Sequence, residues 1–345
     1  MKNLSVLISI ILFLSLHVLA QQNKNTVRGF VFDKSDSEPL AGVNVYISNT
    51  LWGSSTDKDG RFIIESIPEG THELVVSMMG YQVQTKMFRI KKNETKKMQF
   101  RLKPQVYETD AITVVAADKA DWYIELNIFK DKFIGKTAFA KQCFIKNEPV
   151  LNFDWEKSIM RAKAKEPLII INRALGYKIH SILIAFSWDK AKERLSWVAK
   201  NQYSELTPKD EAQKQTWQKN RDQTFDYSQV NFLNWLKSED REDKYKLQYY
   251  QERPVHLLNP NQYYVIKADS LIHPGISDDE HEIIFKDYLK VIHKKSANAS
   301  YLRLNHQVVT IDKFGYPQEI LPFEVYGYWA MLGLADMLPM YYGQF

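Results

Sequence analysis

The sequence predicts an all-β sandwich followed by a larger α+β domain, with a signal peptide in front of both. Three observations support this prediction: a charged and then apolar N-terminus, short alternating segments over residues 27–103, and a later gain in aromatic residues, since seven of the eight tryptophans lie at Trp122 or beyond. Many short alternating segments are typical of a sandwich or barrel. A chain of 345 residues is long enough for two domains that each bury a core.

Residues 1–20 have the three parts of a secretory signal peptide. Lys2 supplies the positive charge, residues 4–16 form a short apolar stretch, and Val18 and Ala20 are small residues before a cleavage site at Gln21. An uncleaved N-terminal anchor is the alternative. No later apolar run is long enough to cross a membrane. We therefore expect an exported protein without a transmembrane segment after cleavage, either periplasmic or associated with the outer membrane or extracellular.

The charge balance and the cysteine count narrow the functional classes. The formal charge is +5, from 46 basic and 41 acidic residues, and no basic arm stands alone. Nucleic-acid binding needs a focused basic face, so we do not expect it. Cys143 is the only cysteine, which leaves no internal disulfide. Its apolar neighbours Phe144 and Ile145 predict a buried structural thiol rather than a nucleophile.

The first domain is predicted from seven short segments rich in β-branched and aromatic residues and bounded by Gly, Pro, Asp or Asn. In the segment GVNVYIS, for example, Val43, Val45 and Ile47 lie on one face and Asn44 lies on the other. The segments cover residues 27–33, 42–48, 51–57, 61–67, 71–81, 84–90 and 96–102.

Four sequence blocks in this region match a known family in the same order. They are G-x-V-x-D in VRGFVFD, P-L-x-G-V-x-V in EPLAGVNVYI, T-D-x-D-G-x-F-x-I in TDKDGRFIIESIPEG, and a hydrophobic strand that closes on Gly-Tyr in VVSMMGY. Residues 27–103 thus resemble a carboxypeptidase regulatory-like domain of the prealbumin-like (transthyretin-like) sandwich fold. The resemblance implies a non-catalytic accessory domain, which in Bacteroidetes often precedes outer-membrane TonB-dependent receptors or begins secreted proteins.

The sequence lacks the motifs of the peptidase and of serine hydrolases. A zinc carboxypeptidase needs H-x-x-E and a later histidine, and none of the eight histidines has Glu three residues later. HEIIF at 281–285 begins like a metalloprotease helix, but Phe285 stands where the second ligand belongs. G-x-S-x-G is also absent. We therefore expect no enzymatic activity, no catalytic residues and no cofactor.

The acidic segment TDKDG at 56–60 allows two interpretations. Asp57 and Asp59 are weak candidates for a calcium site, but Arg61 stands where a calcium loop needs a fifth-position oxygen ligand. An Asp-Gly pair between two strand-like segments is typical of a hairpin turn, because glycine adopts the positive φ that such turns need. The turn is the favoured interpretation.

Residues 104–121 are predicted to be a linker and 122–345 an α+β domain. Phe129 and Phe133 fit one face of a short helix, and two strands are expected on either side of residues 172–176. Thr207 is the predicted N-cap of a polar helix anchored by Trp217, and Ser228 caps the next helix. Strands follow from residue 245. Segments such as NIFKDKFIGKT and EPLIIINRALGYKI resemble a Bacteroidetes secreted domain of unknown function.

The second domain offers one weak candidate for a metal site. The loop HPGISDDEHE places His273, Asp278, Asp279, Glu280 and His281 close in sequence, which suits zinc or calcium but equally a solvated loop.

The leading functional hypothesis is a non-enzymatic binding or scaffold protein of the cell envelope, with another envelope protein or a glycan as its partner. The alternatives are a glycan-binding surface protein that uses exposed aromatic rings, and a metal-dependent hydrolase that uses the second domain.

Overall fold

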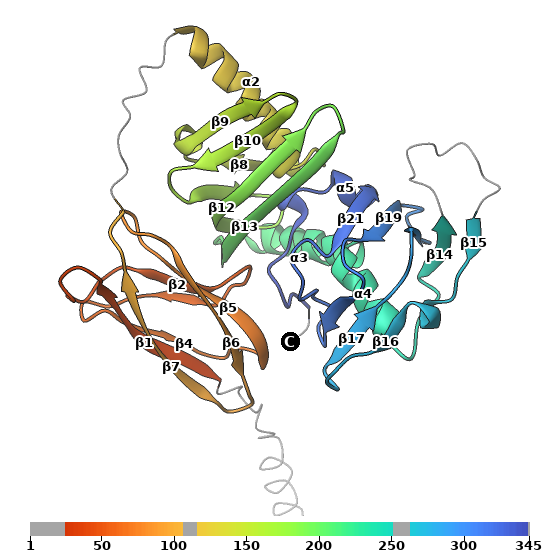
Figure 1. Cartoon of the computed structure of the whole chain (residues 1–345), viewed down its shortest axis with the longest axis horizontal. Coiled ribbons are helices and arrows are strands. Elements are labelled where there is room, and N and C mark those ends of the chain that lie inside the picture. Colours follow the sequence, from red (N-terminus) through yellow and green to blue (C-terminus); the bar gives the residue numbers. More distant parts are fainter. Residues whose placement is uncertain (1–24, 106–115, 251–262, 344–345) are drawn as a thin grey trace, which may run out of the picture. The chain divides into compact units, whose positions relative to one another are not determined.

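The computed structural model describes residues 25–105, 116–250 and 263–343. The chain divides into two compact units, Met1–Asp110 and Ala111–Phe345 (Figure 1). The predicted signal peptide lies outside the described residues. The predicted linker 104–121 overlaps the second unit, because its last six residues form the start of the first helix, α2 (Ala116–Phe133). No helix in the described ranges is both long and apolar enough to cross a lipid bilayer.

The first unit is a sandwich of two sheets, which confirms the predicted fold class. One sheet has the strand order β4-β1-β7 and the other β3-β2-β5-β6. The inner faces of both sheets contribute to one apolar core that includes Val31, Val45, Phe62, Leu74 and Phe100. The strands are β1 (Thr26–Asp33), β2 (Asn44–Ile47), β3 (Gly53–Ser55), β4 (Arg61–Ile64), β5 (Gly70–Ser77), β6 (Gln84–Ile90) and β7 (Thr95–Leu102).

The block G-x-V-x-D on β1 has a physical explanation at each of its positions. A Cβ at Gly29 would lie 1.8 Å from the carbonyl oxygen of Met98 on β7, so only glycine fits this position. Val31 is fully buried in the core. Asp33 accepts hydrogen bonds from the Ser35 amide at 2.6 Å and from the Tyr81 hydroxyl at 2.7 Å. These bonds lower the pKa of Asp33, and they join the first block to the closing Gly-Tyr of the fourth.

The predicted hairpin at Asp57–Gly60 is wrong in its pairing but correct as a turn. β3 pairs with β2, whereas β4 pairs with β1, so the turn carries the chain from one sheet to the other. After the turn, β4 forms its backbone hydrogen bonds with β1. This pairing places Phe62 and Ile64 in the core between the two sheets. Alternation predicts which side chains point inward, but it does not predict which strand supplies the hydrogen bonds.

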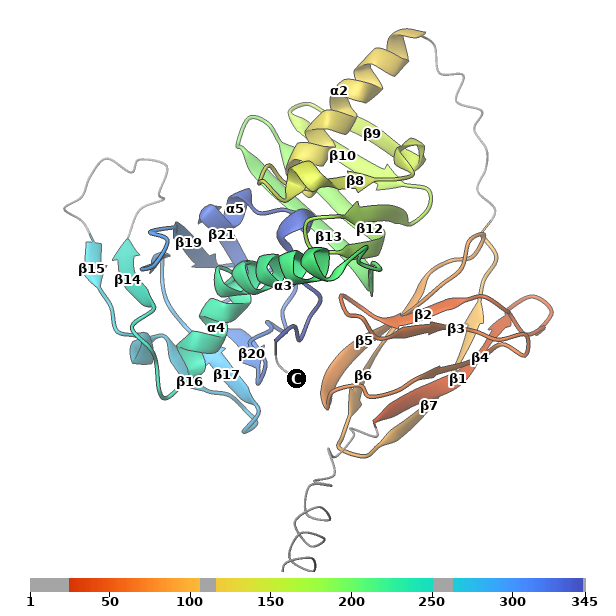
Figure 2. The same ribbon diagram turned by 180° about the vertical axis from the view of Figure 1, so that it is seen from behind.

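The second unit begins with α2 and a six-stranded antiparallel sheet of order β8-β11-β12-β10-β9, with β13 paired to β12. Phe129 and Phe133 of α2 are fully buried against this sheet, as predicted from their spacing, and Figure 2 shows α2 lying across it. Cys143 on β8 is buried, also as predicted, and burial raises the pKa of its thiol to about 12. The strands are β8 (Cys143–Ile145), β9 (Leu151–Glu156), β10 (Ile159–Ala164), β11 (Leu168–Asn172), β12 (Tyr177–Asp189) and β13 (Arg194–Glu205).

Two helices follow, α3 (Glu211–Asp226) and α4 (Gln229–Lys237). The predicted cap at Thr207 is wrong: Asp210 is the N-cap of α3, and its carboxylate accepts a hydrogen bond from the Gln213 amide at 2.7 Å. A carboxylate is favoured at this end because it also faces the positive end of the helix dipole. Ser228 caps α4 as predicted, through a 3.0 Å bond from the Asn231 amide.

The rest of the unit is mostly antiparallel sheet. A five-stranded sheet has the order β15-β14-β18-β19-β21, and a three-stranded sheet has the order β16-β17-β20. Their shared core includes Phe232 and Leu236 of α4 together with Leu289 and Leu302. The elements are β14 (Tyr245–Tyr250), β15 (Tyr263–Val265), β16 (Ile272–Pro274), β17 (Glu280–Ile283), β18 (Tyr288–His293), β19 (Ala299–Leu304), β20 (Val309–Asp312), β21 (Phe323–Gly327) and α5 (Tyr328–Met331).

Candidate functional site

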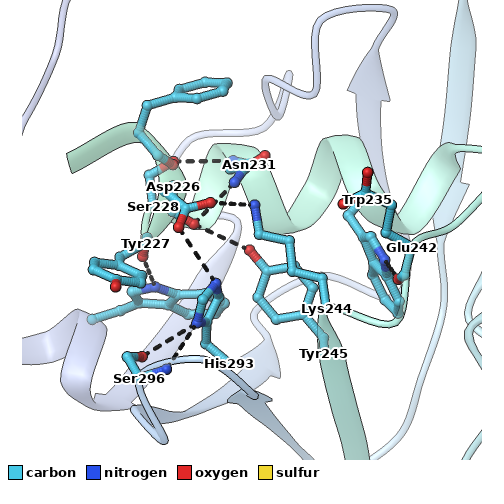
Figure 3. A network of polar contacts seen from close by, with 12 residues as sticks. Asp226, Tyr227, Ser228, Asn231, Trp235, Glu242, Lys244, Tyr245, His293 and Ser296 are labelled. Carbon is cyan, nitrogen blue, oxygen red and sulfur yellow. Dashed lines mark hydrogen bonds and ion pairs between the residues drawn. The ribbon is translucent and has the colours of Figure 1, made fainter. Parts of the chain in front are cut away.

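A polar cluster lies in the second unit where α3 ends and α4 begins, facing the start of β14 and the end of β18 (Figure 3). Its central residues are Asp226, Lys244, Tyr245, His293 and Ser296. The cluster forms because α3 ends at Asp226 and α4 begins three residues later, at Gln229, after its cap Ser228. The Asp226 carboxylate therefore points toward the strands rather than along a continuous helix, as Figure 3 shows.

The Asp226 carboxylate contacts two basic groups. One oxygen pairs with Lys244 Nζ at 2.5 Å, and the other lies 3.8 Å from His293 Nε2. The second ring nitrogen of His293, Nδ1, lies 3.3 Å from the Ser296 hydroxyl oxygen. Tyr227 and Tyr245 pack edge-on against the imidazole, with ring centroids 4.8 and 5.2 Å away. Because these two rings enclose the imidazole on two sides, His293 is only 6% exposed.

Burial lowers the pKa of His293, and the nearby Lys244 and Lys295 lower it further. Asp226 opposes this change because its carboxylate favours a charged imidazole. The loss of hydration is the largest of these effects, so the ring is neutral at pH 7. In this state His293 can accept or donate hydrogen bonds, but it does not form a strong ion pair with Asp226.

The order carboxylate, imidazole and hydroxyl is that of a hydrolase triad, but the contacts here are longer than those of an assembled triad. Contacts of 3.8 and 3.3 Å exceed the range of about 2.6–3.2 Å expected between a nucleophile, its base and the residue that orients the base. The enclosed space beside His293, lined by Tyr227, Asn298 and Trp329 among others, is about 10 Å³. That is enough for roughly one water molecule, whereas substrate pockets measure about 300–1,000 Å³.

Other hydrogen bonds around the cluster hold the fold together. The Trp329 indole donates to the Tyr227 carbonyl oxygen at 2.8 Å, and the Asn231 amide donates to the Asp226 carbonyl oxygen at 2.9 Å. The sequence does not reveal this cluster, because Asp226 and His293 are 67 positions apart and share no motif. The one local signal was the predicted cap at Ser228, which places a break between the two helices.

The stability of the protein should fall on mild acidification, and His293 should contribute to this fall. A histidine in the unfolded chain takes up a proton near pH 6.5, whereas folded His293 stays neutral to lower pH. The stability that this group contributes is therefore present above pH 6.5 and is lost as the pH falls below it. Chemical unfolding between pH 7.5 and 5.5 should show a smaller pH slope for His293→Gln than for the parent chain.

Part of the slope should remain in that variant, because burial also lowers the pKa of His72, His180 and His281. His306→Gln is the matched control, since its ring is exposed. An unchanged slope in His293→Gln would contradict the assignment of a neutral, buried His293.

The acidic loop predicted as a weak metal site is a β-hairpin in the structure. His273 on β16 is paired with Glu282, and Pro274 is paired with His281 on β17. Because neighbouring positions on a strand face opposite sides, the two histidines point away from each other. Within the described part of the chain, no group of three or more His, Cys, Asp or Glu side chains is placed to hold a metal ion.

The acidic residues of this loop contact other side chains or solvent instead of sharing one site. Asp279 pairs with Lys313 at 3.8 Å, and Glu280 accepts a hydrogen bond from Gln318 at 2.9 Å. Asp278 is exposed.

The two aspartates of the TDKDG segment also have separate positions. One oxygen of Asp57 accepts hydrogen bonds from the backbone amides of Asp59 and Arg61, both at 2.9 Å. Gly60 has a φ of +70°, as the turn requires. Asp57 thus closes the turn with its side chain, while Asp59 contributes its backbone amide and is itself exposed.

Among the residues that the structure describes, the exposed aromatic side chains are Phe30, Tyr123, Trp155, Tyr263 and Tyr264. Trp155 is the most exposed tryptophan at 37%, and it meets Trp188 edge-on, at 69° between the ring planes. In the second unit, Tyr250 and Tyr263 stack with centroids 6.0 Å apart and 29° between the planes. Lys290 Nζ lies 5.7 Å from the centre of the Tyr250 ring and covers that ring in part.

Comparison with known proteins identifies the first unit. Residues 27–114 match the family model of the CarboxypepD_reg-like domain, so this unit is a domain of that type, as its four sequence blocks predict. A segment of 73 residues is 44% identical to the TonB-dependent receptor SusC of Bacteroides thetaiotaomicron. The match covers 21% of this chain and 7% of the receptor, so the chain spans only a small part of that relative.

Likenesses to solved structures are weak. A type II cohesin–X-dockerin complex of Acetivibrio cellulolyticus is 24% identical, covering 22% of this chain and 52% of that chain at a TM-score of 0.18. A DUF3823 family protein of Bacteroides uniformis is 8% identical, covering 78% of this chain and 90% of that chain, also at 0.18. Scores of this size do not establish a shared architecture.

Proposed function

We propose that this chain is a non-enzymatic binding or scaffold protein of the bacterial cell envelope, with another envelope protein as its principal partner. The observation that carries the proposal is the size of the space at the His293–Asp226 pair. This pair has the residue types of a triad, and beside it there is room for about one water molecule. This supports a role in binding rather than catalysis at this pair.

The comparisons support the envelope context of this proposal. The first unit is a CarboxypepD_reg-like domain, and a 73-residue segment of the chain is similar to part of a TonB-dependent receptor from Bacteroides. A domain of this kind presents two sheet faces and several loops, which suit contact with a neighbouring macromolecule. The predicted signal peptide would deliver the chain to the same compartment.

Cross-linking in intact cells tests the binding role. A tagged full chain, cross-linked and purified from periplasmic and outer-membrane fractions, should retain one or a few envelope proteins at near-stoichiometric amounts. An unrelated exported protein with the same tag serves as the control for non-specific capture. If the chain is recovered alone from both fractions, the binding role is wrong.

A turnover assay tests the non-enzymatic part of the proposal separately. The mature chain should release no product from panels of peptides, esters and glycans, with or without added divalent metal. Turnover that disappears in His293→Gln or Ser296→Ala, or on addition of a chelator, would make the hydrolase alternative correct and this part of the proposal wrong.

A further inference from the structure

The outer face of the sheet β4-β1-β7 is strongly basic. In the paired register of these three strands, the side chains opposite the core alternate with the buried ones, and most of them are exposed. Four are cations, and none of the outward side chains on these described strands is acidic. We call this surface the basic face; it consists of Thr26, Arg28, Phe30, Phe32, Arg61, Ile63, Thr95, Lys97, Gln99 and Arg101.

Four residues of the basic face form a continuous column of rings and guanidinium groups. Phe30 and Phe32 stack with their centroids 6.0 Å apart and their planes 16° apart. Arg61 lies over the Phe30 ring and Arg101 over the Phe32 ring, each with its guanidinium carbon 5.7 Å from the ring centre. The register places Arg61 opposite Phe30 on β4 and Arg101 opposite Phe32 on β7. The column therefore crosses all three strands.

The arrangement of rings and guanidinium groups in the column indicates which kind of ligand this face could bind. A guanidinium group lies over each ring, while Phe30 keeps 40% of its surface exposed. The guanidinium groups are held in place by cation–π contact, and the Arg101 group also donates to the Ser37 hydroxyl at 2.8 Å. Each still has other N–H groups free to donate to a carboxylate. The face is suited to an anion with repeated charges rather than to an uncharged ligand.

A hollow adjoins the basic face on the β7 side. It measures about 360 Å³ and is lined by Lys34, Gln84, Gln99, Phe100 and Arg101. This volume is in the range of small-ligand sites and could hold one acidic sugar residue. Two cations and two side-chain amides line it, which combines charge for a carboxylate with hydrogen-bonding groups for hydroxyls.

We propose that the basic face and its hollow bind an acidic polysaccharide, one whose sugars carry carboxylate groups. The hollow would take one acidic sugar, and the arginines of the column would pair with carboxylates of the sugars that follow. An anionic membrane is the less suited partner, because the hollow is lined by two side-chain amides that suit the hydroxyl groups of a sugar. This inference rests on the proposed binding role and names a second ligand class for it.

Binding of polygalacturonic acid by the full mature chain tests this inference. The parent chain should bind it at low salt, bind more weakly at high salt, and ignore neutral dextran of similar length. Arg61→Gln with Arg101→Gln should weaken binding by roughly tenfold or more, since two charge-assisted contacts are lost. Lys86→Gln with Arg89→Gln removes the same charge from β6 of the other sheet, and this control should stay within about twofold of the parent chain. Lys34→Gln tests the hollow separately and should also weaken binding.

Thermal melting of each variant first establishes that it is folded. Equal losses in the column variant and the β6 control would overturn the proposal, as would the absence of binding to polygalacturonate. Binding to vesicles of phosphatidylglycerol and phosphatidylcholine, but not to polygalacturonate, would overturn it in favour of a membrane. If polygalacturonate fails while cross-linking still captures an envelope protein, this inference is wrong and the proposed function stands.

Discussion

Replacing Gly29 with alanine should unfold the first unit and leave the second unit folded. The added methyl group would lie 1.8 Å from the Met98 carbonyl oxygen and 2.7 Å from its carbon, both in the backbone of the paired strand β7. No rotamer relieves this overlap, so β1 and β7 must separate. Overpacking of this kind costs about 3 kcal/mol or more, a large part of the stability of a small domain.

The measurement is a thermal or chemical unfolding curve of the full chain, together with limited proteolysis. Residues of the first unit should be cleaved early in Gly29→Ala, and the second unit should persist as a stable fragment. Gly80→Ala is the matched control: Gly80 has a φ of +80°, but its added Cβ would meet nothing within 4 Å. Its cost should be limited to about 1–2 kcal/mol of backbone strain. Equal stability of Gly29→Ala and the parent chain would refute the account of this position.

Replacing Arg221 with leucine should destabilise the second unit by about 3–5 kcal/mol. Arg221 on α3 is 8% exposed, and its guanidinium donates to the carbonyl oxygens of Leu175 and Gly176 at 2.7 and 3.3 Å. It also pairs with Glu205 at 2.6 Å and lies 4.1 Å from the centre of the Tyr177 ring. Leucine would leave the two buried carbonyl groups without this donor.

Chemical unfolding monitored by tryptophan fluorescence would measure this loss, because Trp217 lies on the same helix and donates to the Arg173 carbonyl oxygen at 2.7 Å. Lys219→Leu is the matched control: it removes the same charge from an exposed position of α3. Its effect should stay within about 0.5 kcal/mol. Similar losses in the two variants would show that charge, rather than the buried hydrogen bonds, explains the effect.

Sequence analysis predicted local features of the first unit well and strand pairing poorly. The alternation around Val43 and Val45 identified the inward side chains, because inward orientation depends only on a period of two. The hairpin predicted at Asp57–Gly60 is wrong in its pairing. A turn sequence predicts that the chain reverses, but it does not predict which strand the next segment will pair with. In the second unit the predicted start of α3 was also displaced, because the N-cap is Asp210, three residues after Thr207.

The candidate sites were beyond sequence analysis for a similar reason. Asp226 and His293 meet only because α3 stops opposite β18, and no spacing encodes that contact. The basic face could not be seen in the sequence either, because Arg28, Arg61 and Arg101 come from three separated segments. Each arginine is at an outward position of its strand, but the register of three strands was needed to bring them together.

The pairing of β1 with β7 has a mechanical consequence. These strands are the first and last of the sandwich, and they run parallel over eight residue pairs from Thr26–Thr95 to Asp33–Leu102. The chain therefore enters the pair at one end and leaves it at the other. A pull along the chain loads all the hydrogen bonds between the two strands in shear, so they must break together rather than open one by one. If the chain were anchored on one side of the sandwich and bound to a partner on the other side, tension along the chain would pass through this pair of strands.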